Sequence, residues 1–200
     1  MFKKIKNRPR VKEIEKIIYI LKQENKNSIL ANLSHKNIIN FFSQVVASKE
    51  LELYIAINTT IIGYAITAKK PEYLIKNFEK MKYFFFLDLL IKLKLLTLTN
   101  VVISKLNIDS LFLSKKNDKL VSESYNLNLL AIERKYQSKG IGKKFLSYII
   151  NDIKKKKGKF ISCETNDERS NEFYKKKLRF KNIGNKFRFP KLMKIMIKKL

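Results

Sequence analysis

The residues between 137 and 143 have the types and spacing of a phosphate-binding turn. Gly140 and Gly142 lie just before a stretch with helical apolar spacing, and Lys139 and Lys143 flank them. Such a turn exposes backbone N–H groups at the positive end of a helix, where they bind phosphate without a side-chain charge. Gly140 leaves room for a phosphate against the backbone, and Gly142 permits close packing in the first helical turn. The spacing fits neither a Walker loop nor the dinucleotide fingerprint.

The elements on either side of this turn should position it. Residues 119–132 are predicted to form a long strand whose end, "LLAI", is apolar on both faces, as is typical of a central strand. Apolar residues recur at helical spacing from 141 to 153. We expect this helix to end at the lysines of 154–157, with Gly158 in the left-handed conformation.

The string "LNLLAIERKYQSKGIGKKFLSYI" resembles the acyl-CoA-binding motif of the GNAT superfamily of N-acetyltransferases. Gln137, Gly140 and Gly142 match the family signature "[RQ]xxGxG", and Tyr136 precedes it. The resemblance implies that a splayed strand exposes backbone groups to the pantetheine arm of acetyl-CoA and that the following amides hold its pyrophosphate. The cofactor-binding residues implied here are Leu130, Ala131, Ile132, Gln137, Ser138, Lys139, Gly140, Ile141, Gly142 and Lys143.

A second segment, "ETNDERSNEFYKKKLRF", resembles the family pattern "N..A..FY.k.GF". The resemblance implies that Tyr174 protonates the departing thiolate of coenzyme A, which suits a phenol with a pKa of ~10. It also places Asn166 and Asp167 at the cofactor. Two departures are visible, because arginine replaces the usual glycine at 179 and Tyr174 lies one residue too far from Phe180. The alternative role for Tyr174 is that of a core aromatic residue.

The general base is not evident from the sequence. The polar residues just before the apolar strand end are Asn126 and Asn128, which are not acids. Glu123 and Glu164 are the candidate carboxylates, and either could instead be an ordinary surface or paired group. His35, the single histidine, is expected to be solvated or to cap a helix.

Cys163 is the single cysteine, so an internal disulfide and a metal site of paired thiolates are both excluded. It resembles a buried strand residue, which disfavours a thiol nucleophile. We therefore expect direct attack of an amine on the thioester in a ternary complex, without a metal.

The order of elements predicts the fold class. We expect a strand at 2–8, helices from 11 and 34, a hairpin at 51–57 and 61–68, a turn at 114–118, a strand at 159–164, a helix at 168–177, and two closing strands. This order predicts a single α/β domain over 1–200 with a mixed sheet and helices on both faces. The resemblance implies a mostly antiparallel sheet with a splayed parallel pair. Residues 71–108 read as a helical insertion.

Charge limits the partners. The chain has 44 Lys and Arg against 17 Asp and Glu, a formal net charge of +27, which favours an anionic partner and repels polycations. The insertion is similar to that of GNAT proteins of surface-polysaccharide synthesis, which implies an amino sugar or a nucleotide-linked amino sugar as the acceptor amine. The insertion could form a wall or lid of the acceptor pocket, lie on an anionic membrane or cover a partner in a homodimer.

Two other functions remain open at this stage. A nucleic-acid-binding module would need a basic aromatic stripe, whereas the lysines here are spread over every element. A degenerate acyltransferase fold that only binds partners is consistent with Arg179 and with the missing base. We expect a cytoplasmic location, because no signal peptide is evident and charges interrupt the most apolar stretch, 83–98.

Overall fold

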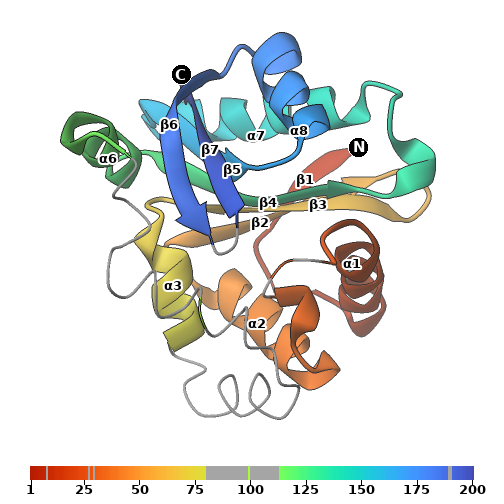
Figure 1. Ribbon diagram of the computed structural model, residues 1–200. Coiled ribbons are helices and arrows are strands. Elements are labelled where there is room, and N and C mark those ends of the chain that lie inside the picture. The colour runs from red at the N-terminus through yellow and green to blue at the C-terminus, as the bar shows by residue number, and fades with distance from the viewer. Residues whose placement is uncertain (8, 27, 29, 80–98, 100–112, 189–190) are drawn as a thin grey trace.

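The computed structural model describes residues 1–7, 9–26, 28, 30–79, 99, 113–188 and 191–200. Seven strands form one sheet in the order β1-β2-β3-β4-β5-β7-β6 (Figure 1). The strands are β1 (Phe2–Ile5), β2 (Leu51–Ile57), β3 (Ile61–Ala68), β4 (Tyr125–Ile132), β5 (Phe160–Thr165), β6 (Lys181–Arg188) and β7 (Lys191–Lys199). The α-helices are α1 (Val11–Glu24), α2 (His35–Ala47), α3 (Glu72–Glu79), α6 (Lys115–Ser122), α7 (Ile141–Lys155) and α8 (Glu168–Glu172).

All neighbouring strands are antiparallel except β4 and β5, which are parallel. This parallel pairing covers only Tyr125–Leu127 on β4 and Ile161–Cys163 on β5. Beyond it, β4 continues to Ile132 and β5 to Thr165 without pairing to each other. The predicted mixed, mostly antiparallel sheet with a splayed parallel pair is therefore confirmed.

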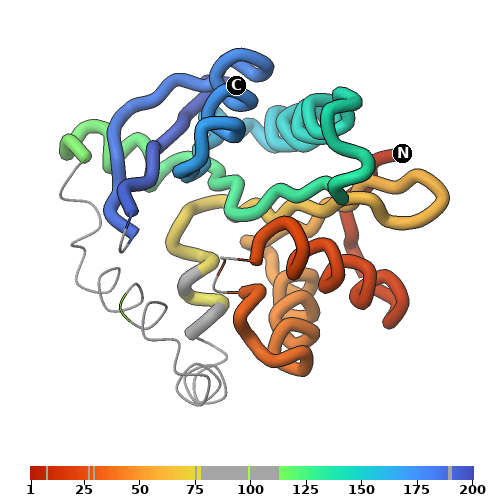
Figure 2. Tube along the Cα trace, turned by 45° about the vertical axis from the view of Figure 1, so that its right-hand side comes forward, coloured from red at the N-terminus to blue at the C-terminus, as the bar shows by residue number. Residues whose placement is uncertain are grey.

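Helices cover both faces of the sheet, as Figures 1 and 2 show. The apolar stripes of α1 and α2 pack on one face of β2 and β3, and α7 packs on the other face against β4 and β5. Because both faces are covered, β2 and β3 are buried along nearly their whole length. The predicted helices on both faces are confirmed, and the splayed ends of β4 and β5 lie between the two helical layers.

The prediction of one long strand over 119–132 is wrong in its first part. Residues 115–122 form α6, and β4 begins only at Tyr125. The predicted turn at 114–118 is the start of this helix, where the side chain of Ser114 accepts a hydrogen bond from Asn117 N. A serine N-cap followed by charged helix formers outweighs the weak strand pattern. Glu123 is consequently the C-cap of α6 and does not lie on a strand.

The end of α7 also differs from the prediction. Lys157, not Gly158, takes the left-handed conformation, with a φ of 62°. The glycine is needed for another reason, because a Cβ at Gly158 would lie 2.4 Å from Ile153 Cγ2 and 3.0 Å from Tyr125 Cε2. Close packing of the helix end against β4 therefore excludes a side chain there.

Of the predicted insertion at 71–108, the described part consists of α3 and of residues 71 and 99, and the remainder lies outside the described residues. Across the described ranges, no helix is long and apolar enough to cross a membrane. The same residues contain no group of three or more His, Cys, Asp or Glu side chains that could hold a metal ion.

A cluster of charged side chains ties β1 and β2 to the end of α7. Lys156 Nζ lies 2.7 Å from Glu52 Oε1 and also bonds Asp152, while Lys4 Nζ lies 2.5 Å from the same Glu52 oxygen. Tyr54 Oη lies within 2.6 Å of both carboxylates. Burial alone raises the pKa of Glu52, but the hydrogen bonds from Lys156 and Lys4 outweigh it and hold that pKa below its ordinary value of 4.5.

Replacing Lys156 with methionine should lower the free energy of unfolding by about 2 kcal/mol at pH 7. This loss is smaller than the ~3–5 kcal/mol that removing one partner of a fully buried ion pair costs, because the side chains of Lys156 and Asp152 are each nearly a third exposed. The carboxylate pKa values are lowered on folding, so this contribution is present above their ordinary values of 4.5 and 3.8 and is lost as the pH falls through the lower folded values.

Urea unfolding of the wild type and of Lys156→Met at pH 7 and below pH 4 tests this expectation. Lys176→Met removes an exposed pair with Glu172 and should leave the free energy of unfolding nearly unchanged, because solvent screens the pair. Equal stability of Lys156→Met and Lys176→Met at pH 7 would show that the cluster contributes nothing.

Candidate functional site

The site begins where β4 leaves β5. One edge of β4 pairs with β3 up to Ile132, but the edge toward β5 has no strand partner among the described residues after Leu127. A β-bulge at Asn128, which has no partner residue on β3, bends the strand at this point. Leu130, Ala131 and Ile132, predicted to face the pantetheine arm, all lie on this unpaired stretch.

The loop after β4 leads directly into α7 and presents the backbone amides of its first turn. Gly140 is the N-cap, in the left-handed conformation with a φ of 74°, and it has no side chain to cap the helix. The first helical hydrogen bond is donated by Lys144 N to Gly140 O at 3.1 Å. The amides of Ile141, Gly142 and Lys143 precede that bond, so they are the ones a phosphate could use.

The two glycines of this loop differ in the space around them. A Cβ added to Gly140 meets no atom within 4 Å, so this position faces open space. A Cβ added to Gly142 would lie 3.5 Å from Phe173 Cζ, an ordinary contact. Gly140 thus forms the open cradle, and Gly142 allows the helix to pack on the aromatic side chain of Phe173.

Cationic and polar side chains surround this cradle. Ser138 has a φ of 61°, unusual for a residue with a side chain, and its Oγ lies 3.5 Å from Arg169 Nη2. Lys139 and Lys143 are exposed beside Gly140, and Lys139 Nζ lies 5.9 Å from the ring centroid of Tyr136. The positive charge and the row of amides therefore lie together at the start of α7, as an anionic ligand requires.

Gln137 is directed into the protein. Its Nε2 donates to Ile132 O at 2.7 Å and to Glu24 Oε2 at 2.9 Å. The side chain thus holds the loop against β4 and α1. The backbone carbonyl of Ile132, which was predicted to face the cofactor, accepts one of the two hydrogen bonds from Gln137.

The end of β5 and the start of α8 form the other side of the opening. Asp167 Oδ1 accepts a hydrogen bond from Ser170 N at 2.8 Å and caps α8, next to the exposed Asn166. Two buried oxygens nearby in the chain, Thr165 Oγ1 and Asn171 Oδ1, have no hydrogen-bond partner within the described part of the chain. Buried polar atoms are normally paired, so these two are candidate partners for a ligand with amide groups. The sequence did not single them out, because burial without a partner is visible only in three dimensions.

Tyr174 lies at the apex of the opening. Its side chain interacts electrostatically with that of Cys163, the last residue of β5 that pairs with β4. Its ring is buried against Phe173 and Phe180, at centroid distances of 5.3 and 5.4 Å. Tyr174 is therefore both a core aromatic residue and the hydroxyl at the divergence point of β4 and β5.

The unusual spacing between Tyr174 and Phe180 has a structural basis. Residues 173–177 form a π-helical turn, which accommodates one extra residue and leaves Phe180 in the core. Arg179, at the position where glycine is usual, has a φ of 59°. The backbone there is left-handed, which explains why glycine is the common choice and shows that arginine still adopts the same turn.

Burial raises the pKa of Tyr174 well above 10, and the Cys163 thiol adds to this effect. Burial likewise raises the pKa of Cys163, so its thiol is protonated and a poor nucleophile at neutral pH.

Among the candidates for the general base, Glu164 on β5 pairs with Arg188, and Arg188 Nη2 lies 2.9 Å from Glu164 Oε1. His35 is exposed and lies 2.8 Å from Glu15 Oε1, which matches the predicted solvated role.

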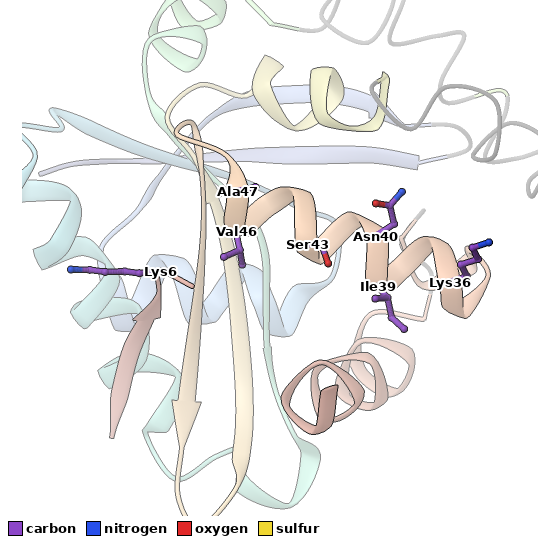
Figure 3. A pocket seen from close by; sticks show the side chains of 7 residues that line it. All are labelled: Lys6, Lys36, Ile39, Asn40, Ser43, Val46 and Ala47. Carbon is purple, nitrogen blue, oxygen red and sulfur yellow. The ribbon is translucent and has the colours of Figure 1, made fainter. Parts of the chain in front are cut away.

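Two grooves lie on the surface of the described part of the chain. One, of about 490 Å³, starts at the N-terminus of α7 and includes Gly140 and Lys143. The other, of about 550 Å³, lies along α2 and contains none of the predicted site residues; its lining is Lys6, Lys36, Ile39, Asn40, Ser43, Val46 and Ala47 (Figure 3).

Comparisons with known proteins agree with this geometry. Residues 113–180 match the family model described as the acetyltransferase (GNAT) family. The chain has the GNAT acetyltransferase fold. The matched segment runs from the start of α6 to Phe180 and so contains the splayed strand, the glycine loop, α7 and Tyr174. Curated proteins give no match to the sequence.

Solved structures of N-acetyltransferases and of a similar protein superpose over the whole chain. A polyamine N-acetyltransferase of Drosophila melanogaster has a TM-score of 0.59 at 11% identity, with 100% of each chain covered. PaiA N-acetyltransferase of Thermoplasma acidophilum, solved in complex with coenzyme A, has a TM-score of 0.54 at 14% identity, with 100% of this chain and 99% of that chain covered. A mosquito arylalkylamine N-acetyltransferase-like protein has a TM-score of 0.56 at 16% sequence identity, with 100% of each chain covered.

These comparisons confirm the predicted GNAT fold, and one of the similar structures was solved in complex with coenzyme A. The residues of the glycine loop and of the end of β5 fit coenzyme A as a ligand. The open cradle at Gly140 and the amides of Ile141–Lys143 suit its pyrophosphate. Thr165 Oγ1 and Asn171 Oδ1 have no partner among the described residues, as partners for pantetheine amides should.

Proposed function

We propose that the protein transfers the acetyl group of acetyl-CoA to the primary amine of a small molecule. The observation that carries this proposal is the juxtaposition of the splayed β4–β5 pair with an uncapped helix start at Gly140. The first can admit an extended pantetheine arm, and the second can bind the pyrophosphate at its end. Single surface lysines or a lone glycine turn would not provide both a space for the pantetheine arm and a site for the pyrophosphate.

When bound, acetyl-CoA supplies an acetyl thioester. The amine nitrogen forms a bond to the acetyl carbon, the carbon–sulfur bond breaks, and the nitrogen gives up a proton. The amides of 141–143 hold the donor, and the hydroxyl of Tyr174 lies where β4 and β5 diverge, which we assign to the sulfur. Cys163 has a raised pKa and is not required as a carrier of the acetyl group, so transfer is direct.

The role of Tyr174 is that of a hydrogen-bond donor to the departing sulfur. A thiol has a pKa of ~8.5, below that of the buried phenol, so a full proton transfer from tyrosine to the thiolate is unfavourable. A hydrogen bond to a developing negative charge in a dry site stabilises it without such a transfer. The proton released by the amine then neutralises the thiolate through solvent.

For the acceptor, we propose an amine that also carries an anionic group, such as a phosphorylated or nucleotide-linked amino sugar. The support is the net charge of +27, which concentrates anions near the surface and repels polycations. The Drosophila relative is named for polyamines, so the opposite preference is a real alternative for this fold. Cytoplasmic location, contact with an anionic membrane and a homodimer remain predictions.

Acetyl-CoA turnover with a panel of amines tests this function. We expect a phosphorylated amino sugar to be acetylated with a kcat/KM at least about tenfold above that of the unphosphorylated sugar and of a polyamine, and the advantage to shrink at high salt because screening weakens the attraction. A preference for the polyamine would contradict the acceptor proposal alone. No turnover with any amine, together with salt-sensitive binding of nucleic acid, would contradict the enzyme itself.

A further inference from the structure

Helix α1 is joined to the glycine loop by a single carboxylate. Glu24, the last residue of α1, accepts a hydrogen bond from Arg134 N at 3.0 Å on Oε1 and one from Gln137 Nε2 at 2.9 Å on Oε2. The same Gln137 nitrogen donates to Ile132 O at 2.7 Å. One side chain on α1 thus fixes both ends of the turn at 134–137, and through Gln137 it reaches the end of β4.

This contact lies directly before the amides of the cradle. Gln137 is followed by Ser138, whose φ of 61° is costly for a residue with a side chain and persists only where neighbours hold the backbone. Hydrogen bonds to an ionised carboxylate are stronger than those between neutral groups. A second tie runs in parallel, since Lys16 Nζ of α1 lies 2.9 Å from Glu133 Oε2. The loop is therefore held from the α1 side before any ligand binds.

Glu15, another carboxylate of α1, makes no such contact. Glu15 lies on the same helix and pairs with His35 at the start of α2. Its side chain is half exposed, and its partner belongs to another helix. The difference between Glu24 and Glu15 is therefore the loop contact, so Glu15 is the matched control.

We propose that Glu24 is a positioning residue of the donor site, which acts through Gln137 to hold the amides of residues 138–143 in their binding arrangement. This inference rests on the proposed function, because the ligand whose binding is strengthened is acetyl-CoA. It assigns a role in donor binding to a residue 110 positions away from Arg134 in the sequence and on the opposite face of the sheet from α7.

The test combines two measurements on the full chain. The first is the Kd of acetyl-CoA by calorimetry for wild type, Glu24→Ala, Gln137→Ala and the double variant. We expect each single variant to weaken binding about tenfold and the double variant to be no weaker than the worse single one, because both remove the same arrangement. The second is hydrogen exchange of the amides of 137–143 in the ligand-free protein, which should speed up in Glu24→Ala and stay unchanged in Glu15→Ala.

The outcomes separate this inference from the function it builds on. Additive losses in the double variant, or unchanged loop exchange in Glu24→Ala, would overturn the positioning role, since a general loss of stability produces additivity. If the wild type binds no acetyl-CoA, the proposed function fails. Exchange of the loop amides in the ligand-free protein still decides in that case whether Glu24 holds the loop.

Discussion

Replacing Gly140 with asparagine should weaken the binding of acetyl-CoA at least about 30-fold while leaving the fold intact. Asparagine tolerates the left-handed conformation better than other residues with side chains, so the φ of 74° costs little. The added Cβ meets no protein atom within 4 Å, which means that it fills only the space assigned to the pyrophosphate. Calorimetry with acetyl-CoA measures the loss, and thermal unfolding checks the fold.

The neighbouring glycine supplies the control. In Gly142→Ala the new Cβ would lie 3.5 Å from Phe173, an ordinary contact on the protein side of the helix. We expect Kd to change by less than about threefold, because no space of the cradle is lost. Equal Kd values for wild type and Gly140→Asn would show that the start of α7 does not hold the donor.

Replacing Tyr174 with phenylalanine should lower kcat about a hundredfold and leave the Kd of acetyl-CoA within about twofold, because the lost group stabilises charge that develops only during transfer. The ring remains packed between Phe173 and Phe180, so the core is retained. Since burial holds the pKa of Tyr174 well above 10, kcat of the wild type should not fall between pH 7 and pH 10 through ionisation of this residue. Steady-state kinetics across that range measure both effects.

Cys163→Ala distinguishes the role of the hydroxyl from that of its present partner. That variant removes the thiol that interacts with Tyr174 but keeps the phenol, so kcat should stay within a few-fold of wild type. If Tyr174→Phe turned over as fast as wild type, Tyr174 would be only a core residue, as the alternative interpretation of the sequence had it.

Local sequence signals predicted the strand, the glycine turn and the helix of the proposed donor site. A buried strand, a glycine turn and an amphipathic helix are adjacent in the chain, so their order already fixes the geometry at Gly140. The one-residue mismatch before Phe180 was also visible, although its solution, a π-helical turn, was not. Such a turn depends on how the core holds Tyr174 and Phe180, and not on local propensity.

Features that depend on distant contacts could not be predicted. Gln137 resembled a ligand contact, but its partner Glu24 lies 113 positions away, so only the folded chain shows that the side chain is directed inward. At the end of α7 the glycine was recognised, yet the left-handed residue is Lys157 and the glycine serves the contact with Tyr125. The helix at 115–122 was mistaken for a strand because its short apolar pattern is ambiguous without its packing partners.

Calorimetric titration of the unmodified protein with acetyl-CoA tests the central claim most directly. We expect one site per chain with a Kd in the micromolar range, a binding free energy of about −8 kcal/mol, and competition by free coenzyme A. Absence of binding at acetyl-CoA concentrations of about 1 mM, with the protein shown to be folded, would contradict it.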